Sequence, residues 1–235
     1  MVSRAPLHSL ENKEVFDFKT VEDIPVPEGF QRVKAHSFGE WLRRRPLKKD
    51  RQVYLYNGRL KTNQQAQFAV LDIPIGARDL QQCADAVMRL RAEYFFEQGQ
   101  FDQIVFRDNA HRAYPFKPPY TKARLERYLE QVYAACGTLS LEASLKPVGR
   151  NSNSLPGDVW IHGGSPGHAA IMLDLARDQK GRLVALIANS YMPAQSIHIV
   201  RNIQQENLSP WILIEDRRGV LLPEWQFYAG ELRRF

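Results

Sequence analysis

DLQQCADAVMRLRAEYFF, residues 79 to 96, predicts a long amphipathic helix with a cysteine in its second turn. Asp79 is a suitable N-cap, and Gln82 three residues later completes the pattern of a capping box. Apolar side chains then recur at helical spacing, with Arg91 as the one exception on that face: Leu80, Cys83, Ala84, Val87, Leu90 and Tyr94. Cys83 is therefore expected on the inward face near the positive end of the helix dipole, where a thiol loses its proton more easily. The alternative is a small core residue, because free cysteine is among the most buried residue types.

The segments around this helix predict an α+β fold. A buried strand at residues 66–73 precedes the helix, and a second helix follows it, capped by Thr121 and ended by Gly137, with Cys136 as a core residue. From Asp158 onward the pattern becomes β, with strands expected at residues 158–162, 168–175, 182–189, 196–200 and 211–215. This order predicts an N-terminal arm at residues 1–25 and a single α+β domain at residues 26–235.

Composition excludes several classes of protein. Of the 235 residues, 44% are hydrophobic and 25% are charged, which is ordinary for a globular protein. The net charge of +6 owes much to the run RRRPLKKDR at residues 43–51, which we interpret as solvated surface. A nucleic-acid partner is not expected, because no groove-reading motif accompanies this run. Two cysteines do not form a disulfide framework.

The chain as given contains neither a predicted membrane span nor an export signal. No apolar stretch approaches the roughly 18 residues that cross a bilayer, and the first 20 residues lack an apolar signal core. We therefore expect a cytoplasmic protein as encoded, or a periplasmic or secreted one if a leader was trimmed. The oligomeric state is left open by the sequence.

The second informative stretch, PGDVWIHGGSPGHAAIMLDLARDQKGRLVALIANSYMPAQSIHIV at residues 156 to 200, predicts a hairpin of two buried strands. If Leu173 pairs with Val184, the same register places His168 opposite Asn189, and opposite residues point to the same face. Asn189 would then hold one ring nitrogen of His168 while the other faces a thiolate, as nucleophilic catalysis requires. A slip of one residue would put Ala188 or Ser190 in place of Asn189.

A cysteine on a helix, a Gly-Asp strand, a Gly-His strand and a polar residue on the next strand resemble the papain-like hydrolases of the NlpC/P60 type. Those proteins are mostly peptidases and amidases that often act on the cell wall. The resemblance implies a papain-like domain in which Cys83 is the nucleophile, His168 the general base and Asn189 the residue that orients the base. Gln82 or the backbone N–H of Cys83 would help to form an oxyanion hole.

A longer resemblance covers nearly the whole chain. SFGEWLRRRPL (37 to 47), GTLSL (137 to 141), SYMPAQSIHIV (190 to 200) and SPWILIED (209 to 216), together with the two stretches quoted above, are similar to an uncharacterised bacterial family, the domain of unknown function number 4846. That resemblance implies no particular activity. Many members carry export signals, which this chain lacks.

Taken together, the patterns predict a cysteine hydrolase for a peptide, glycan or other small amide or acyl substrate. The binding surface is predicted from Gln82, Asp158, Tyr191, Gln195 and His198. Asp158 has a simpler alternative as a turn or capping residue. His162 and His198 are too widely spaced from His168 to predict a metal site, so we expect no metal and no cofactor. The second hypothesis is a non-catalytic module on the same fold that binds a peptide or glycan and buries its thiol.

Overall fold

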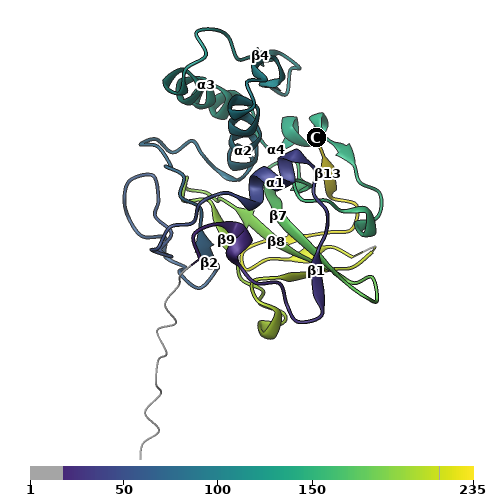
Figure 1. Cartoon of the computed structure of the whole chain (residues 1–235). Coiled ribbons are helices and arrows are strands. Elements are labelled where there is room, and N and C mark those ends of the chain that lie inside the picture. The colour runs from purple at the N-terminus through teal and green to yellow at the C-terminus, as the bar shows by residue number, and fades with distance from the viewer. Residues whose placement is uncertain (1–17, 217) are drawn as a thin grey trace, which may run out of the picture.

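In the computed structural model, which describes residues 18–216 and 218–235, the α-helices are α1 (Ser37–Arg43), α2 (Cys83–Glu97), α3 (Lys122–Ala135) and α4 (Thr138–Ser144). Short 3-10 helices lie at Val21–Asp23, Phe101–Gln103, Asn151–Asn153 and Glu206–Leu208. Figure 1 shows α1, α2 and α4 gathered over the strands β7 and β8, with α3 further out.

The helix that carries the cysteine begins later than predicted. Gln82 is the N-cap of α2, and its backbone N–H donates to Asp85 Oδ2 at 2.9 Å. Asp79 is not the cap, because its carboxylate accepts a hydrogen bond from the backbone N–H of Ala194 at 2.7 Å. The capping pattern is thus displaced by three residues, and Cys83 stands in the first turn of the helix rather than the second.

The second long helix agrees with the prediction. Thr121 caps α3, and its hydroxyl oxygen accepts from the backbone N–H of Arg124 at 3.3 Å. The predicted inward face is buried through Leu125, Tyr128, Leu129 and Val132. Cys136, which was expected in the core, is the C-cap of the helix and is only partly buried against the core.

One large antiparallel sheet forms the centre of the molecule. Its strands lie in the order β2 (Gln67–Val70), β9 (His198–Val200), β8 (Leu183–Asn189), β7 (His168–Asp178), β6 (Val159–His162), β13 (Leu232–Arg234) and β5 (Lys146–Pro147). Two further strands join it off this path: β1 (Phe30–Arg32) pairs with β7, and β10 (Ile212–Ile214) pairs with β8. Two small ladders stand apart, β3 (Val105–Arg107) with β4 (Ala113–Pro115), and β11 (Val220–Leu221) with β12 (Gln226–Phe227). The predicted α+β class is confirmed, and its papain-like form stays a prediction.

The register of the central hairpin differs from the predicted one. Val184 pairs with Ala176 rather than with Leu173, and the ladder shifts by one residue at a bulge between Met172 and Asp174. His168 and Asn189 are therefore not directly opposite. Strands buried on both faces lack the alternation of polar and apolar residues that would have fixed this register in the sequence.

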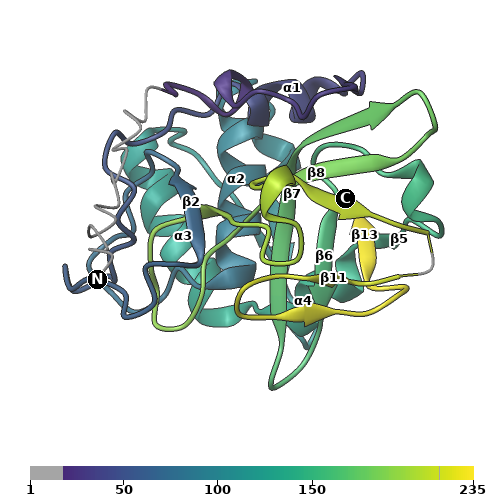
Figure 2. The same ribbon diagram turned by 90° about the horizontal axis from the view of Figure 1, so that it is seen from below.

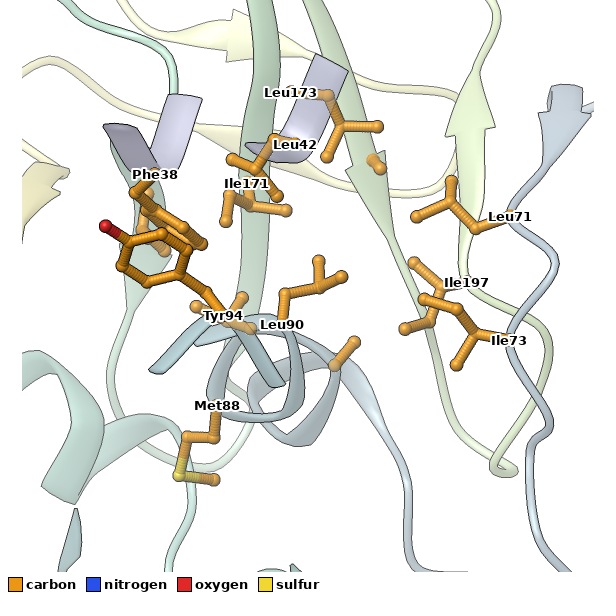
Figure 3. Packing of buried hydrophobic residues seen from close by; sticks show 14 of the residues in the cluster. Phe38, Leu42, Leu71, Ile73, Met88, Leu90, Tyr94, Ile171, Leu173 and Ile197 are labelled. Atoms are coloured by element: carbon orange, nitrogen blue, oxygen red, sulfur yellow. The ribbon is translucent and has the colours of Figure 1, made fainter. Parts of the chain in front are cut away.

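Both faces of the sheet are covered. On one face, α1 and α2 pack on β7 through the cluster shown in Figure 3, where Leu42 of α1 and Leu90 of α2 approach Ile171 of β7. Burying such a side chain stabilises the fold by about 1.5–3 kcal/mol. The opposite face carries a second cluster that includes Met172, Ile187 and Phe227 of β12. In the view from below, β11 lies in front of the sheet and α2 behind it (Figure 2).

The basic run is not uniformly solvated surface, as the sequence had suggested. Arg43 is only 6% exposed, and its Nε lies 2.6 Å from Oδ1 of the fully buried Asp174. Arg45 stacks its guanidinium over the ring of Trp41 at 3.6 Å. Arg44 alone of these three is exposed. The stems and charges of two of the three arginines are therefore part of the folded structure.

Of the predicted N-terminal arm, residues 1–17 lie outside the described residues. The following segment is part of the core, because Val21 and Ile24 are buried in the helix-side cluster. Among residues 18–216 and 218–235, no helix is both long and apolar enough to cross a membrane.

Candidate functional site

Cys83 is the first residue of α2, and its thiol lies beside the start of β7. Backbone N–H groups of Ala169, Ala84 and Cys83 itself hydrogen-bond to the sulfur and act to lower its pKa. Burial has the larger effect and raises the pKa of the thiol to about 11, with a smaller contribution in the same direction from the Asp85 carboxylate. The side chain is 7% exposed. The easily ionised thiol expected from the sequence is therefore a neutral thiol in the closed structure.

His168 opens β7 and directly precedes Ala169, and its ring packs against Trp225 and Phe227 on the sheet face opposite α2. Its Nε2 lies 3.0 Å from Nδ2 of Asn189 at the end of β8. The imidazole is 1% exposed, and burial, assisted by the positive charge of Lys61, lowers its pKa to about 3. The ring is consequently neutral at physiological pH and available as a proton acceptor.

The polar side chains extend across neighbouring strands on one face of the sheet. His168 pairs with His162 of β6, and Asn189 pairs with His198 of β9, so each pair shares a face. We call the three buried members, His168, Asn189 and His198, the polar row. Burial is the main reason that the pKa of His198 is also lowered to about 3, and Lys61 again contributes.

Aromatic rings enclose His168. Tyr191 lies 4.8 Å away between ring centroids, Trp225 5.2 Å and Phe227 5.7 Å. Burial raises the pKa of the Tyr191 hydroxyl, with smaller contributions in the same direction from the Glu224 carboxylate and from a charge on Cys83. These rings keep water away from the imidazole.

The loops that flank the site are tied to each other. The Ser190 hydroxyl lies 3.2 Å from the carbonyl oxygen of Gln81 and 2.9 Å from that of Gln195. Gln82 contributes the N-cap of α2, and its Nε2 donates to Asp79 Oδ1 at 3.3 Å. Gln195 is buried, and its Nε2 has no hydrogen-bond partner among the described residues. Of the predicted binding residues, Tyr191 contacts His168, His198 pairs with Asn189, and Gln82 directly precedes Cys83.

Asp158 is the exception. Its carboxylate forms a two-point ion pair with Arg234, with Nε at 2.6 Å from Oδ1 and Nη2 at 2.7 Å from Oδ2, and accepts from the backbone N–H of Leu155 at 2.8 Å. Burial raises its pKa, although Arg234 acts in the opposite direction. These contacts give Asp158 a turn and ion-pair role in the fold, and none of them links it to Cys83.

The sequence did not draw attention to four residues that border the site. Trp225 and Phe227 cover His168, and the buried Lys61 forms an ion pair with Glu224. Tyr191 donates a hydrogen bond to the Glu224 carbonyl oxygen at 3.4 Å, which links this pair to the site. The available signal was the spacing of Trp225 and Phe227, two residues apart at the short strand β12, which places both rings on one side of the chain. Nothing local indicates which face of the large sheet these rings cover.

The described residues show no group of three or more histidine, cysteine, aspartate or glutamate side chains able to hold a metal ion. His162, considered in the sequence as a metal ligand, instead has its Nδ1 2.7 Å from Glu231 Oε1.

No curated protein and no solved structure matches the chain. A protein-family match covers residues 21–118 and 107–234, and the chain therefore belongs to the family described as domain of unknown function (4846).

Proposed function

We propose that this chain is a cysteine hydrolase of the papain-like type that cleaves an amide or related acyl bond. The observation that supports the proposal is a thiol in the first turn of α2 beside the backbone of Ala169, the residue that follows His168, together with the contact between His168 and Asn189 at 3.0 Å. The proposed roles are nucleophile for Cys83, general base for His168 and orienting residue for Asn189.

In the proposed reaction, the Cys83 thiol must first come within reach of His168, whose ring packs against Phe227 on the sheet face opposite α2. The thiol proton then passes to His168 Nδ1 as the sulfur attacks the substrate carbonyl carbon. The carbonyl oxygen becomes an oxyanion, and the first backbone N–H groups of α2, which lack partners within the helix, are placed to stabilise it. His168 then protonates the leaving amine, and the acyl group remains on sulfur as a thioester. Water, deprotonated by His168, hydrolyses the thioester and restores the thiol.

The closed structure sets a condition on this chemistry. A thiol with a pKa of about 11 and an imidazole with a pKa of about 3 leave the proton on sulfur. Both shifts have burial as their main cause, so solvent or a polar substrate group admitted beside Tyr191 would bring the two pKa values closer together. Once the burial is relieved, the three N–H groups at the sulfur favour the thiolate.

The second candidate is a binding module for a peptide or glycan, and the burial of both Cys83 and His168 favours it. Iodoacetamide labelling at neutral pH, followed by mass spectrometry of the digested chain, separates the two. A hydrolase requires Cys83 to react faster than Cys136, and requires the rate to fall in His168→Ala. Labelling of Cys83 only after unfolding, with no effect of His168→Ala, would favour the binding module and exclude the hydrolase.

A further inference from the structure

The polar row contains two buried atoms that lack hydrogen-bond partners among the described residues, Asn189 Oδ1 and His198 Nε2. They belong to residues that are directly paired across β8 and β9, so their side chains lie side by side on the same face. Buried polar atoms are normally paired, and leaving one unpaired destabilises the fold. Because the two unpaired atoms lie on neighbouring side chains, we expect that a single change in the orientation of these side chains pairs both of them.

The tautomer of His198 follows from its other nitrogen. His198 is 0% exposed, and its Nδ1 lies 2.9 Å from the carbonyl oxygen of Ser196. A carbonyl oxygen only accepts, so Nδ1 carries the hydrogen, and Nε2 of the neutral ring presents a lone pair. His198 thus offers an acceptor toward Asn189.

The amide of Asn189 has one accepting end and one donating end of nearly the same size. If the nitrogen faces His168, the amide oxygen and the Nε2 lone pair of the paired residue His198 are both acceptors, and neither has a donor among the described residues. If the oxygen faces His168, it accepts from Nε2–H of that ring, and the amide N–H groups turn toward the acceptor on His198. Only the second arrangement gives each atom a complementary partner.

We infer that His198 is a positioning residue, whose Nε2 accepts from the Asn189 amide and thereby turns the amide oxygen toward His168. The hydrogen of His168 is then fixed on Nε2, and the Nδ1 lone pair is left free for the thiol proton. This consequence for catalysis rests on the proposed hydrolase function. The orientation of the amide and the tautomers of the two rings do not depend on it.

The electrostatic surroundings maintain this arrangement. A protonated His198 would lose its lone pair and could no longer accept from Asn189. Burial and the nearby charge of Lys61 keep the pKa of His198 at about 3, so the ring stays an acceptor throughout the physiological range.

The test is nitrogen-15 NMR of the histidine rings in the full chain, which reports directly which nitrogen carries the hydrogen. We expect the Nδ1–H tautomer at His198 and the Nε2–H tautomer at His168. In His198→Phe, which keeps a ring but removes the acceptor, the His168 tautomer should become mixed. Labelling of Cys83 by iodoacetamide should then slow by about tenfold, because the base is misoriented. His198→Gln, which restores an acceptor oxygen, should recover both signals.

His162→Phe is the matched control, because His162 is the partner of His168 on the other neighbouring strand but has no link to Asn189. It should leave the His168 tautomer unchanged. In an Asn189→Ala background, His198→Phe should have no additional effect.

An Nδ1–H tautomer at His168 in the unsubstituted chain would overturn the inference, as would an unchanged tautomer in His198→Phe. If His198→Phe does not fold, the spectrum of the unsubstituted chain still decides. Expected tautomers combined with an unreactive Cys83 would support the positioning role and remove the hydrolase.

Discussion

The two halves of β7 both border buried polar side chains, but only one half pairs them completely. In the C-terminal half, Asp174 is 0% exposed and meets Arg43 and Arg32 at 2.6 Å each, and it also accepts from the backbone N–H of Leu175 at 2.8 Å. At the N-terminal end, the polar row buries two histidines and an asparagine with two atoms left unpaired. Complete pairing is typical of a structural anchor, whereas unpaired buried groups are typical of sites that act on something else.

Cys83→Ala is expected to have the largest effect at the polar-row end. Turnover of any substrate should be abolished, because the nucleophile is gone, while the free energy of unfolding should fall by only about 1 kcal/mol for the small cavity. Activity and thermal melting, measured on the same preparation, check the expected loss of turnover and the expected small loss of stability. Cys136→Ser is the control, expected to weaken the core without changing turnover. Full activity in Cys83→Ala would remove the thiol from the chemistry.

Asp174→Ala tests the fully paired end. It should lower the free energy of unfolding by about 3–5 kcal/mol, because the buried Arg43 loses its buried carboxylate partner and keeps only the partly exposed Glu40. Urea denaturation provides the measurement. Arg44→Gln, at an exposed neighbouring position, should stay within about 0.5 kcal/mol of the unsubstituted chain. If Asp174→Ala lowers the free energy of unfolding no more than Arg44→Gln does, the ion pairs of Asp174 contribute nothing to stability.

His198→Gln sharpens the comparison through pH. Between the ordinary histidine pKa of about 6.5 in the unfolded chain and the pKa of about 3 in the folded chain, only the unfolded chain binds the proton. The free energy of unfolding of the natural chain should therefore fall as pH falls through this window. The variant lacks this proton, so the difference between the two chains should change by about 1.4 kcal/mol per pH unit. Parallel curves for the two chains would contradict the burial of a neutral His198.

Asn189→Ala should have the smallest effect. An orienting residue fixes the direction and tautomer of the base but takes no part in bond making, so turnover should drop by about tenfold and not vanish. Rates compared with those of His168→Ala give the measurement. Equal losses in the two variants would show that Asn189 does more than orient the ring.

Elements with strong local patterns were predictable from the sequence, and features set by distant contacts were not. Helix α3 follows directly from Thr121 and its apolar spacing, since both signals are local. The start of α2 was misplaced because Asp79 is used by Ala194, more than a hundred residues away. Arg43 is buried for a similar reason, since its partner Asp174 lies in a distant strand.

The candidate site shows the same limit. Cys83, His168 and Asn189 were identifiable from residue type and order, and the structure places His168 and Asn189 in contact. The reasoning that joined them used a register that is wrong, because a bulge leaves no mark in strands that are apolar on both faces. Trp225 and Lys61 were missed, because their approach to His168 is decided by the packing of separate loops.

The bulge at Leu173 changes the parity of β7 along its length. Before the bulge, even-numbered residues such as His168 and Met172 face away from α2, and after it the even-numbered Asp174 meets Arg43 of α1 on the helix side. One continuous strand can therefore place polar groups on opposite faces at its two ends. Deleting a single residue at this point would turn Asp174 away from Arg43 while leaving His168 on its own face of the sheet. The extra residue Leu173 thus separates the face pattern of the first half of the strand from that of the second, so that the two halves can change in sequence independently of each other.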